Sequence, residues 1–185
     1  MARWEPDTRG RLREAAFELF SERGYDETTV AEIAERAGVT ERTFFRHFAD
    51  KREVLFAGSA QLQETLVSAV TRAADPVSPI DAVAAGLEAV GTVLPDVETA
   101  RRRQAIIVAH PDLQERELIK FDSMSAALAD ALQARGLAEP PATLTAQVGM
   151  AVFRTAFERW VDETNDRGFA ELVRDALVEL RTVTA

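Results

Sequence analysis

Apolar residues recur along the chain at intervals of three and four positions, the spacing that places them on one face of an α-helix. Near the N-terminus this spacing joins Leu12, Ala15 and Leu19, and Gly24 follows as a residue that ends a helix. No segment alternates apolar and polar residues as a half-buried strand does, and no Asn-Gly or Asp-Gly pair marks a hairpin. We therefore expect an all-α fold of about nine helices.

Capping residues, glycines and prolines indicate where these helices begin and end. Thr29 and Glu32 have the spacing of a capping box, with the acidic residue three positions after the threonine. Thr40 and Asp50 are the expected caps of the next two helices, and Gly136 ends a long one. The predicted helices span residues 12–23, 30–37, 40–48, 51–74, 79–94, 97–110, 111–135, 142–164 and 169–183.

The predicted helices form a short N-terminal group followed by a longer one. We expect residues 1–50 to fold as a small three-helix domain and residues 51–185 as a larger helical domain. Pro140-Pro141 predicts a linker inside the second domain, because proline does not continue a helix. No run of about 18 apolar residues is present, so the sequence predicts no membrane-spanning segment.

Composition narrows the class of protein. The chain has no cysteine, which excludes disulfides, thiolate metal sites and a cysteine nucleophile. Its first residues lack the apolar core of a signal peptide, so we expect a cytoplasmic protein. The net charge of −9 opposes the basic surface expected of nucleic-acid-binding proteins. Residues 1–56 hold 10 cations and 12 anions, whereas residues 57–185 hold 12 cations and 19 anions, so most of the acidity lies in the larger domain.

One motif is specific: the two short predicted helices at residues 30–37 and 40–48, joined at Gly38. Glycine adopts the positive φ that such a turn needs, and these dimensions are those of a helix-turn-helix. Phe44 and Phe48 lie four positions apart, so they share the face of the second helix that we expect to be buried.

The other face of this second helix carries Arg42 and Arg46. Guanidinium groups pair with guanine in the major groove, which a short exposed helix can enter. Spacing alone leaves a second interpretation open, in which this is a small helical subdomain and the two arginines are merely solvated.

Residues 11–56 resemble the N-terminal DNA-binding domain of the TetR family of bacterial transcriptional regulators. The resemblance depends on seven stretches, which keep the family's order and spacing. They are Ala15-Ala16-Phe17-Glu18-Leu19-Phe20, Gly24-Tyr25, Thr28-Thr29-Val30, Ile33-Ala34, Ala37-Gly38-Val39-Thr40, Thr43-Phe44-Phe45-Arg46-His47-Phe48 and Lys51-Arg52-Glu53-Val54-Leu55. The remainder of the chain resembles the family only in the number and layout of its helices.

The resemblance implies which side chains contact DNA. Thr29 and Lys51 match positions where the family contacts phosphates from helix N-termini, and His47 matches a frequent phosphate contact. Phe45 stands where many members have tyrosine, which makes this contact apolar. The DNA-contacting residues implied by the resemblance are Thr29, Thr40, Glu41, Arg42, Thr43, Phe45, Arg46, His47 and Lys51.

The resemblance also implies that the larger domain binds a small-molecule effector and a second copy of the chain. The apolar residues expected in the effector pocket, together with one histidine, are Leu62, Leu66, Leu87, Val90, Ile107, His110, Phe121, Met124, Phe153 and Phe157. The apolar stripes of the last two helices predict a dimer interface formed by Val148, Val152, Trp160, Leu172, Val173, Ala176, Leu177 and Leu180. Spacing alone equally allows both sets to be ordinary monomer core, and His110 to be a helix cap.

We therefore expect a ligand-responsive repressor that binds a palindromic double-stranded operator as a homodimer, with no cofactor, no metal and no membrane partner. An enzyme is the weakest alternative, since no Gly-x-Ser-x-Gly, P-loop, Gly-x-Gly-x-x-Gly or His-Glu-x-x-His motif is present. A helical small-molecule-binding or interaction module without sequence-specific DNA binding is the other. Arg101, Arg102 and Arg103 leave two interpretations open, an anionic-ligand site or a solvated face.

Overall fold

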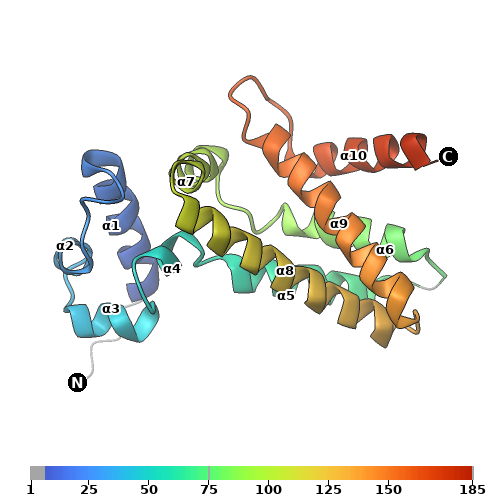
Figure 1. Cartoon of the computed structure of the whole chain (residues 1–185), viewed down its shortest axis with the longest axis horizontal. Helices are drawn as coiled ribbons and strands as arrows, with labels where there is room; N and C mark the ends of the chain where they lie inside the picture. The colour runs from blue at the N-terminus through green and yellow to red at the C-terminus, as the bar shows by residue number, and fades with distance from the viewer. Residues whose placement is uncertain (1–6, 75, 185) are drawn as a thin grey trace. The chain divides into compact units, whose positions relative to one another are not determined.

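The computed structural model describes residues 7–74 and 76–184, and within them it contains helices and no strand (Figure 1). The all-α prediction is confirmed. The helices are α1 (Thr8–Arg23), α2 (Val30–Arg36), α3 (Glu41–His47), α4 (Arg52–Leu55), α5 (Ser59–Arg72), α6 (Pro79–Val90), α7 (Val97–Ala109), α8 (Pro111–Ala134), α9 (Glu139–Trp160) and α10 (Phe169–Thr184). Among these ten helices, none has the length and apolar character needed to cross a bilayer.

The chain divides into two compact units between Ala57 and Gly58. This division lies seven residues beyond the predicted one at residue 50, because α4 packs against α1. Val54 and Leu55 of α4 are buried and belong to the N-terminal core. The residues that follow the helix-turn-helix therefore complete the small unit.

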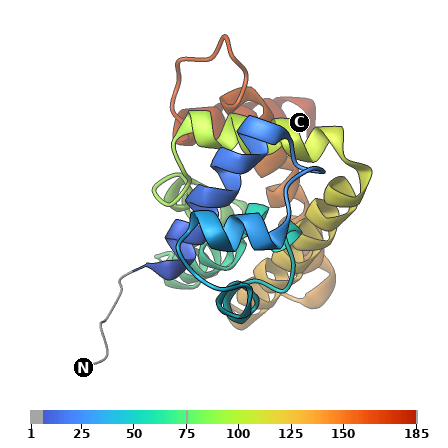
Figure 2. The same ribbon diagram turned by 90° about the vertical axis from the view of Figure 1, so that its left-hand side faces the viewer.

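The N-terminal unit is built on α1, against which α2 and α4 pack, while α3 packs against α2 (Figure 2). Leu12, Leu19, Ile33 and Phe44 fill its interior and are at most 2% exposed. Gly24 ends α1 with a φ of 89° and Gly38 joins α2 to α3 with a φ of 70°, values that side chains disfavour. The predicted helix-turn-helix is present.

The C-terminal unit contains α5 to α10, arranged around one apolar core. In it α5 packs on α6 and α8, α9 packs on α6, α8 and α10, and α7 packs on α8 (Figure 1). Leu66, Val83, Leu87, Leu128 and Val173 are completely buried in this unit. Since most of the core comes from α6, α8, α9 and α10, the interior of the unit is shared by helices far apart in the sequence.

Two predicted helix boundaries were wrong. The single helix expected over residues 51–74 is interrupted at residues 56–58, where Phe56 and Ala57 donate backbone hydrogen bonds over three residues and Gly58 follows. Glycine disfavours helix interiors, so the break falls there. Pro140 and Pro141 do not form a linker but lie in the first turn of α9, where an amide donor is not required.

Gly86 allows α5 and α6 to approach closely. A Cβ atom at this position would lie 2.8 Å from both Leu66 Cδ1 and Val70 Cγ2, and 3.2 Å from the Leu66 carbonyl oxygen. Leu66 and Val70 are fully buried, so they have little room to move. We expect Gly86→Ala to lower the free energy of unfolding by about 1–2 kcal/mol, since overpacking exceeds the gain in helix propensity. Thermal unfolding followed by circular dichroism measures the change. The exposed Ala85→Gly substitution reports propensity alone, and an unchanged melting temperature for Gly86→Ala would contradict the close packing.

Candidate nucleic-acid interface

Helix α3 has one buried and one exposed face. Phe44 is 0% exposed and Phe48 is 3% exposed, and their ring centroids lie 5.5 Å apart. On the other side Phe45 is 53% exposed, and Arg42 and Arg46 are also exposed. The helix is therefore fixed by its aromatic face, while two guanidinium groups and one aromatic ring face outward.

The N-terminal end of α3 is capped by Thr40. Its Oγ1 accepts a hydrogen bond from the Thr43 backbone N–H at 3.3 Å and lies 3.1 Å from Thr43 Oγ1. Thr40 and Glu41 are exposed, whereas Thr43 is half-buried. The side chains expected at the start of the recognition helix thus gather around its first turn.

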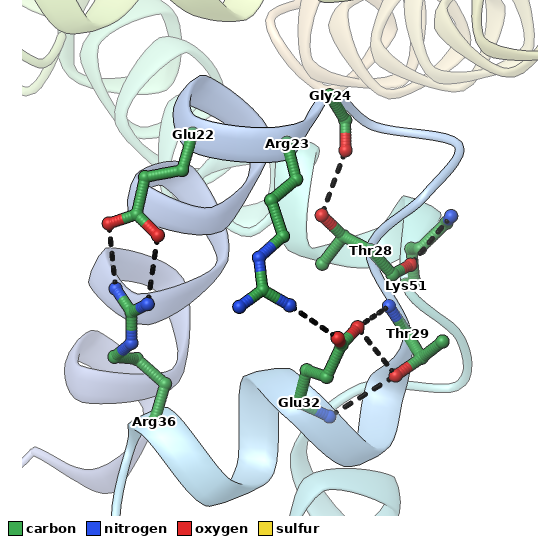
Figure 3. Close-up of polar contacts among 8 residues, drawn as sticks. All are labelled: Glu22, Arg23, Gly24, Thr28, Thr29, Glu32, Arg36 and Lys51. Carbon is green, nitrogen blue, oxygen red and sulfur yellow. Dashed lines mark hydrogen bonds and ion pairs between the residues drawn. The ribbon is translucent and has the colours of Figure 1, made fainter.

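Arginines of α1 and α2 pair with carboxylates of the other helix (Figure 3). Arg36 donates to Glu22 through both terminal nitrogens, at 3.1 and 2.9 Å, and to Glu18 at 3.0 Å. Arg23 pairs with Glu32 at 2.6 Å. These contacts connect α1 to α2, and the hydrogen bond from Arg36 lowers the pKa of Glu22.

Arg42 and Arg46 differ from these structural arginines. Within the described residues neither pairs with a carboxylate. Arg52 pairs with Asp50 at 2.7 Å, so the acidic side chain nearest to the end of α3 is also engaged. Although the unit as a whole is acidic, two guanidinium groups that have no carboxylate partner within the described residues lie on the exposed face of α3, and Arg13 on α1 is a further exposed one.

Thr29 forms the predicted capping box at the start of α2 (Figure 3). The Glu32 carboxylate accepts from the Thr29 backbone N–H and hydroxyl, both at 2.9 Å, and the Glu32 N–H donates to Thr29 Oγ1 at 3.3 Å. The backbone hydrogen bond is the main cause of a lowered pKa for Glu32. A lowered carboxyl pKa stabilises the fold at neutral pH, and this contribution is lost as pH falls through the lowered pKa.

Lys51 is occupied within the fold. Its ammonium group donates to the backbone carbonyls of Tyr25, Asp26 and Thr28 at 2.6, 3.2 and 2.9 Å, and lies 4.3 Å from the centre of the Tyr25 ring. Figure 3 shows the contact with Thr28, whose own hydroxyl donates to the Gly24 carbonyl at 2.8 Å. An ammonium group has three donors, so this side chain secures the loop between α1 and α2.

His47 is the last residue of α3 and is half-buried. Its Nε2 atom is buried and has no hydrogen-bond partner within the described part of the chain. The side chains expected to contact DNA therefore fall into two groups. One is exposed on α3, and the other, formed by Thr29, Lys51 and His47, is partly engaged in the fold.

Comparison with known proteins identifies the family. The model described as "Bacterial regulatory proteins, tetR family" matches residues 12–57, and the one described as "MftR C-terminal domain" matches residues 77–185, more than half of the chain. The chain belongs to the TetR family. In this chain the first family model covers the helix-turn-helix unit, and the second covers most of the C-terminal helical unit.

Individual relatives support this placement. TcmR of Streptomyces glaucescens, an HTH-type transcriptional regulator, is 40% identical over 83 residues, which are 45% of this chain but only 37% of TcmR. MftR of Mycobacterium tuberculosis is 27% identical over 161 residues, or 81% of this chain and 78% of MftR. The crystal structure of Thermus thermophilus FadR, a TetR-family repressor in complex with lauroyl-CoA, superposes with a TM-score of 0.53 and 28% identity over 94% of this chain and 93% of FadR.

The predicted pocket residues of this TetR-family chain divide by burial. Completely or almost completely buried are Leu66, Leu87, Val90, Ile107, Met124 and Phe153. Half-buried are Leu62, His110, Phe121 and Phe157. His110 caps the end of α7, with Nδ1 2.6 Å from the Ile106 carbonyl oxygen. The rings of Phe121 and Phe157 each lie within 6 Å of Phe153, at 5.7 and 5.9 Å, which places an aromatic cluster between α8 and α9.

The residues predicted at the dimer interface lie mostly inside one chain. The six that are at most 9% exposed in the single chain are Val152, Trp160, Leu172, Val173, Ala176 and Leu177. Val148 and Leu180 are half-buried. The apolar stripe of α10 packs against α9 and α6 of its own chain, so packing within one chain accounts for its burial, and its part in a dimer interface stays a prediction.

The three consecutive arginines of α7 have three different environments, which sequence reasoning missed. Arg101 donates to the Val161 and Asp162 carbonyls at 3.0 and 2.7 Å, so it caps the end of α9. Arg102 is exposed, whereas Arg103 pairs with Glu117 of α8 at 3.0 Å with both side chains about four-fifths buried. The run is therefore not a uniform solvated face.

Proposed function

We propose that this TetR-family regulator is a cytoplasmic, effector-released repressor that binds a palindromic operator as a dimer. The observation that carries the proposal is the exposed face of α3, where Arg42 and Arg46 lie beside Phe45 and have no ion-pair partner among residues 7–74 and 76–184. A helix of this kind fits the major groove, and unpaired guanidinium groups are the donors that read guanine there.

Within this proposal the side chains at α3 make different contacts with DNA. Arg42 and Arg46 pair with guanine edges, Glu41 accepts from cytosine, and Phe45 packs on a thymine methyl group or a sugar. Thr40, Thr43 and His47 contact phosphates, which fixes the register of the helix. Thr29 approaches a phosphate through the first turn of α2, and Lys51 acts by holding the adjoining loop in place.

The proposed dimer uses the outward side of α9 and α10. Leu144 and Val178 are each 61% exposed, and Ala151, seven residues after Leu144 and so on the same side of α9, is a small exposed residue. The Arg159–Glu179 ion pair, at 2.7 Å, joins the two helices along the same exposed side. Two copies that meet there form a four-helix interface, which places two recognition helices on half-sites about 34–36 Å apart.

The proposal that an effector binds the C-terminal unit rests on the aromatic cluster of α8 and α9. Pockets for small molecules are lined mainly by apolar and aromatic side chains with a few polar groups. FadR, which shares the fold, was solved with lauroyl-CoA, a ligand with a long apolar chain. An effector that prefers a different spacing of the two recognition helices shifts the population away from the DNA-competent state.

Duplex binding tests the proposal. We expect a high-affinity site to emerge from selection with random-sequence duplexes, and its affinity to fall steeply as salt rises, through counterion release. Arg42→Ala should relax the preference at one base pair in each half-site and cost about 1–3 kcal/mol per lost bidentate contact. Fluorescence anisotropy across a salt series measures both effects.

The exposed Arg13→Ala substitution on α1 is the matched control, since it removes a guanidinium group outside α3. If Arg42→Ala weakened every sequence equally, Arg42 would contact phosphate and not a base. If no duplex bound in a salt-sensitive way, the chain would be a helical interaction module without operator recognition.

A further inference from the structure

The buried face of α7 carries two polar side chains at its centre. Ala100 and Ile107 are at most 1% exposed, and Arg103 and Gln104 lie between them with the spacing of one helix face. Both polar residues are half-buried. A guanidinium group and an amide thus occupy positions where a helix that only packs against its neighbour would carry apolar residues.

Arg103 is electrically balanced by Glu117 of α8. Its Nη1 donates to the Glu117 carboxylate at 3.0 Å, and burial lowers the pKa of the guanidinium while that carboxylate opposes the shift. Taking a guanidinium group out of water is costly without such a partner. The pair itself therefore carries no net charge.

Gln104 is not satisfied in the same way. Its Oε1 atom is buried and accepts no hydrogen bond within the described residues. A buried acceptor without a donor is destabilising, and in native structures such atoms are rare. The group that would satisfy it is a hydrogen-bond donor.

An apolar surface continues from this polar face. Phe121 lies one helical turn beyond Glu117 on α8, on the same side of the helix. Its half-buried ring meets Phe153 at 5.7 Å, and Arg154 covers it at 5.4 Å. A molecule in contact with both regions needs an apolar body and a polar end.

We propose that the buried face of α7 is the polar end of the effector site and binds the hydroxyl group of an uncharged apolar alcohol or phenol. The inference rests on the proposed function, since it assumes that the helical unit holds an effector. A hydroxyl group donates to Gln104 Oε1 and accepts from the guanidinium group of Arg103. A carboxylate is disfavoured, because Glu117 already neutralises Arg103 and both Glu117 and Gln104 present acceptors.

Three probes with one apolar body test this preference: 4-butylphenol, 4-butylbenzoate and butylbenzene. Phenols titrate near pH 10, so the first is uncharged at pH 7 whereas the benzoate is ionised. Isothermal titration calorimetry of the full chain should show the phenol binding about 3- to 10-fold more tightly than butylbenzene, the effect of one uncharged hydrogen bond. The benzoate should bind most weakly. Equal or tighter binding of the benzoate, or no binding of the phenol, would overturn the inference.

Gln104→Leu removes the acceptor without removing volume. We expect the advantage of the phenol over butylbenzene to shrink in this variant, because only the hydrogen bond from Arg103 is left. The melting temperature of the free protein should rise, because a buried unsatisfied group is gone. Gln133→Leu, on the exposed side of α8, is the matched control and should leave the ratio unchanged. A phenol advantage of unchanged size in Gln104→Leu would refute the role of Gln104.

Glu117→Gln should reverse the preference for the phenol over the benzoate. Without the carboxylate, the positive charge of Arg103 is no longer offset by Glu117 and attracts an anion, so the benzoate should now bind more tightly than the phenol. Circular dichroism checks that this variant is folded, and if it is not, Gln104→Leu decides alone. Operator binding without ligand separates the two proposals. Salt-sensitive operator binding with no phenol preference overturns only the inference about the effector, whereas its absence overturns the proposed function.

Discussion

Replacing Lys51 with methionine is expected to destabilise the N-terminal unit by about 3 kcal/mol, although only one half-buried side chain changes. The ammonium group holds the carbonyls of Tyr25, Asp26 and Thr28, and hydrogen bonds to charged groups contribute roughly 1.5–3 kcal/mol each. The sum is discounted because water reaches the exposed Asp26. Differential scanning calorimetry should show the transition of the N-terminal unit at least about 10 °C lower.

Two further variants separate this role from the phosphate contact that the family resemblance implies. Lys51→Arg keeps the charge but not the compact group with three donors, so we expect it to melt early as well. The exposed Arg13→Met removes a cation of α1 and should leave the melting temperature unchanged. If Lys51→Met melted normally and only weakened operator binding with a smaller salt slope, Lys51 would be a phosphate contact.

The helix-turn-helix was predictable because its determinants are local. Phe44 and Phe48 lie one turn apart, Thr29 and Glu32 have capping-box spacing, and Gly38 lies where the turn needs a positive φ. These constraints act over three or four residues, so they can be recognised from the spacing of residues in the sequence. The role of Lys51 could not be found in this way, because its partners lie more than 20 residues away in the sequence.

The helical body shows the limit of reasoning from periodicity. The apolar stripe with Leu172, Val173 and Leu177 predicted a buried face correctly, but burial against α9 and α6 of the same chain gives the same pattern as burial against a partner. Gln104 and Arg103 were missed for a different reason. They interrupt an apolar stripe, and only the position of α8 shows that the interruption faces the interior.

The effect of the chain's net charge on DNA binding also depends on context that the sequence does not show. A net charge of −9 weighs against nucleic-acid binding when it is averaged over the molecule. In the structure, Glu22 and Glu32 are paired with Arg36 and Arg23, so part of the negative charge of the small unit is neutralised within the fold. A phosphate or a base contacts the local distribution of charge at α3, and the net charge of the whole sequence does not describe this distribution.

The proposed dimer surface makes the strongest prediction for DNA binding. Val178→Asp places a charge at the outward side of α10, where the side chain is 61% exposed in a single chain, so the fold should be unchanged. In the dimer this charge would be buried without a partner, which is strongly unfavourable. We expect sedimentation to show a dimer for the unchanged protein and a monomer for the Val178→Asp variant. Operator affinity should fall by about 100-fold or more, because two linked half-site contacts become independent.

The same substitution elsewhere on α10 provides the control. Val183 is 80% exposed and, five residues from Val178, points to another side of the helix, so Val183→Asp should leave both the dimer and operator affinity unchanged. Ala151→Glu on α9 should act as Val178→Asp does, since both lie on the outward side that the Arg159–Glu179 ion pair borders. A Val178→Asp protein that stays dimeric would mean that the copies meet elsewhere. The spacing of the two recognition helices would then be set by a different pair of elements, and α9 and α10 would serve only the core of one chain.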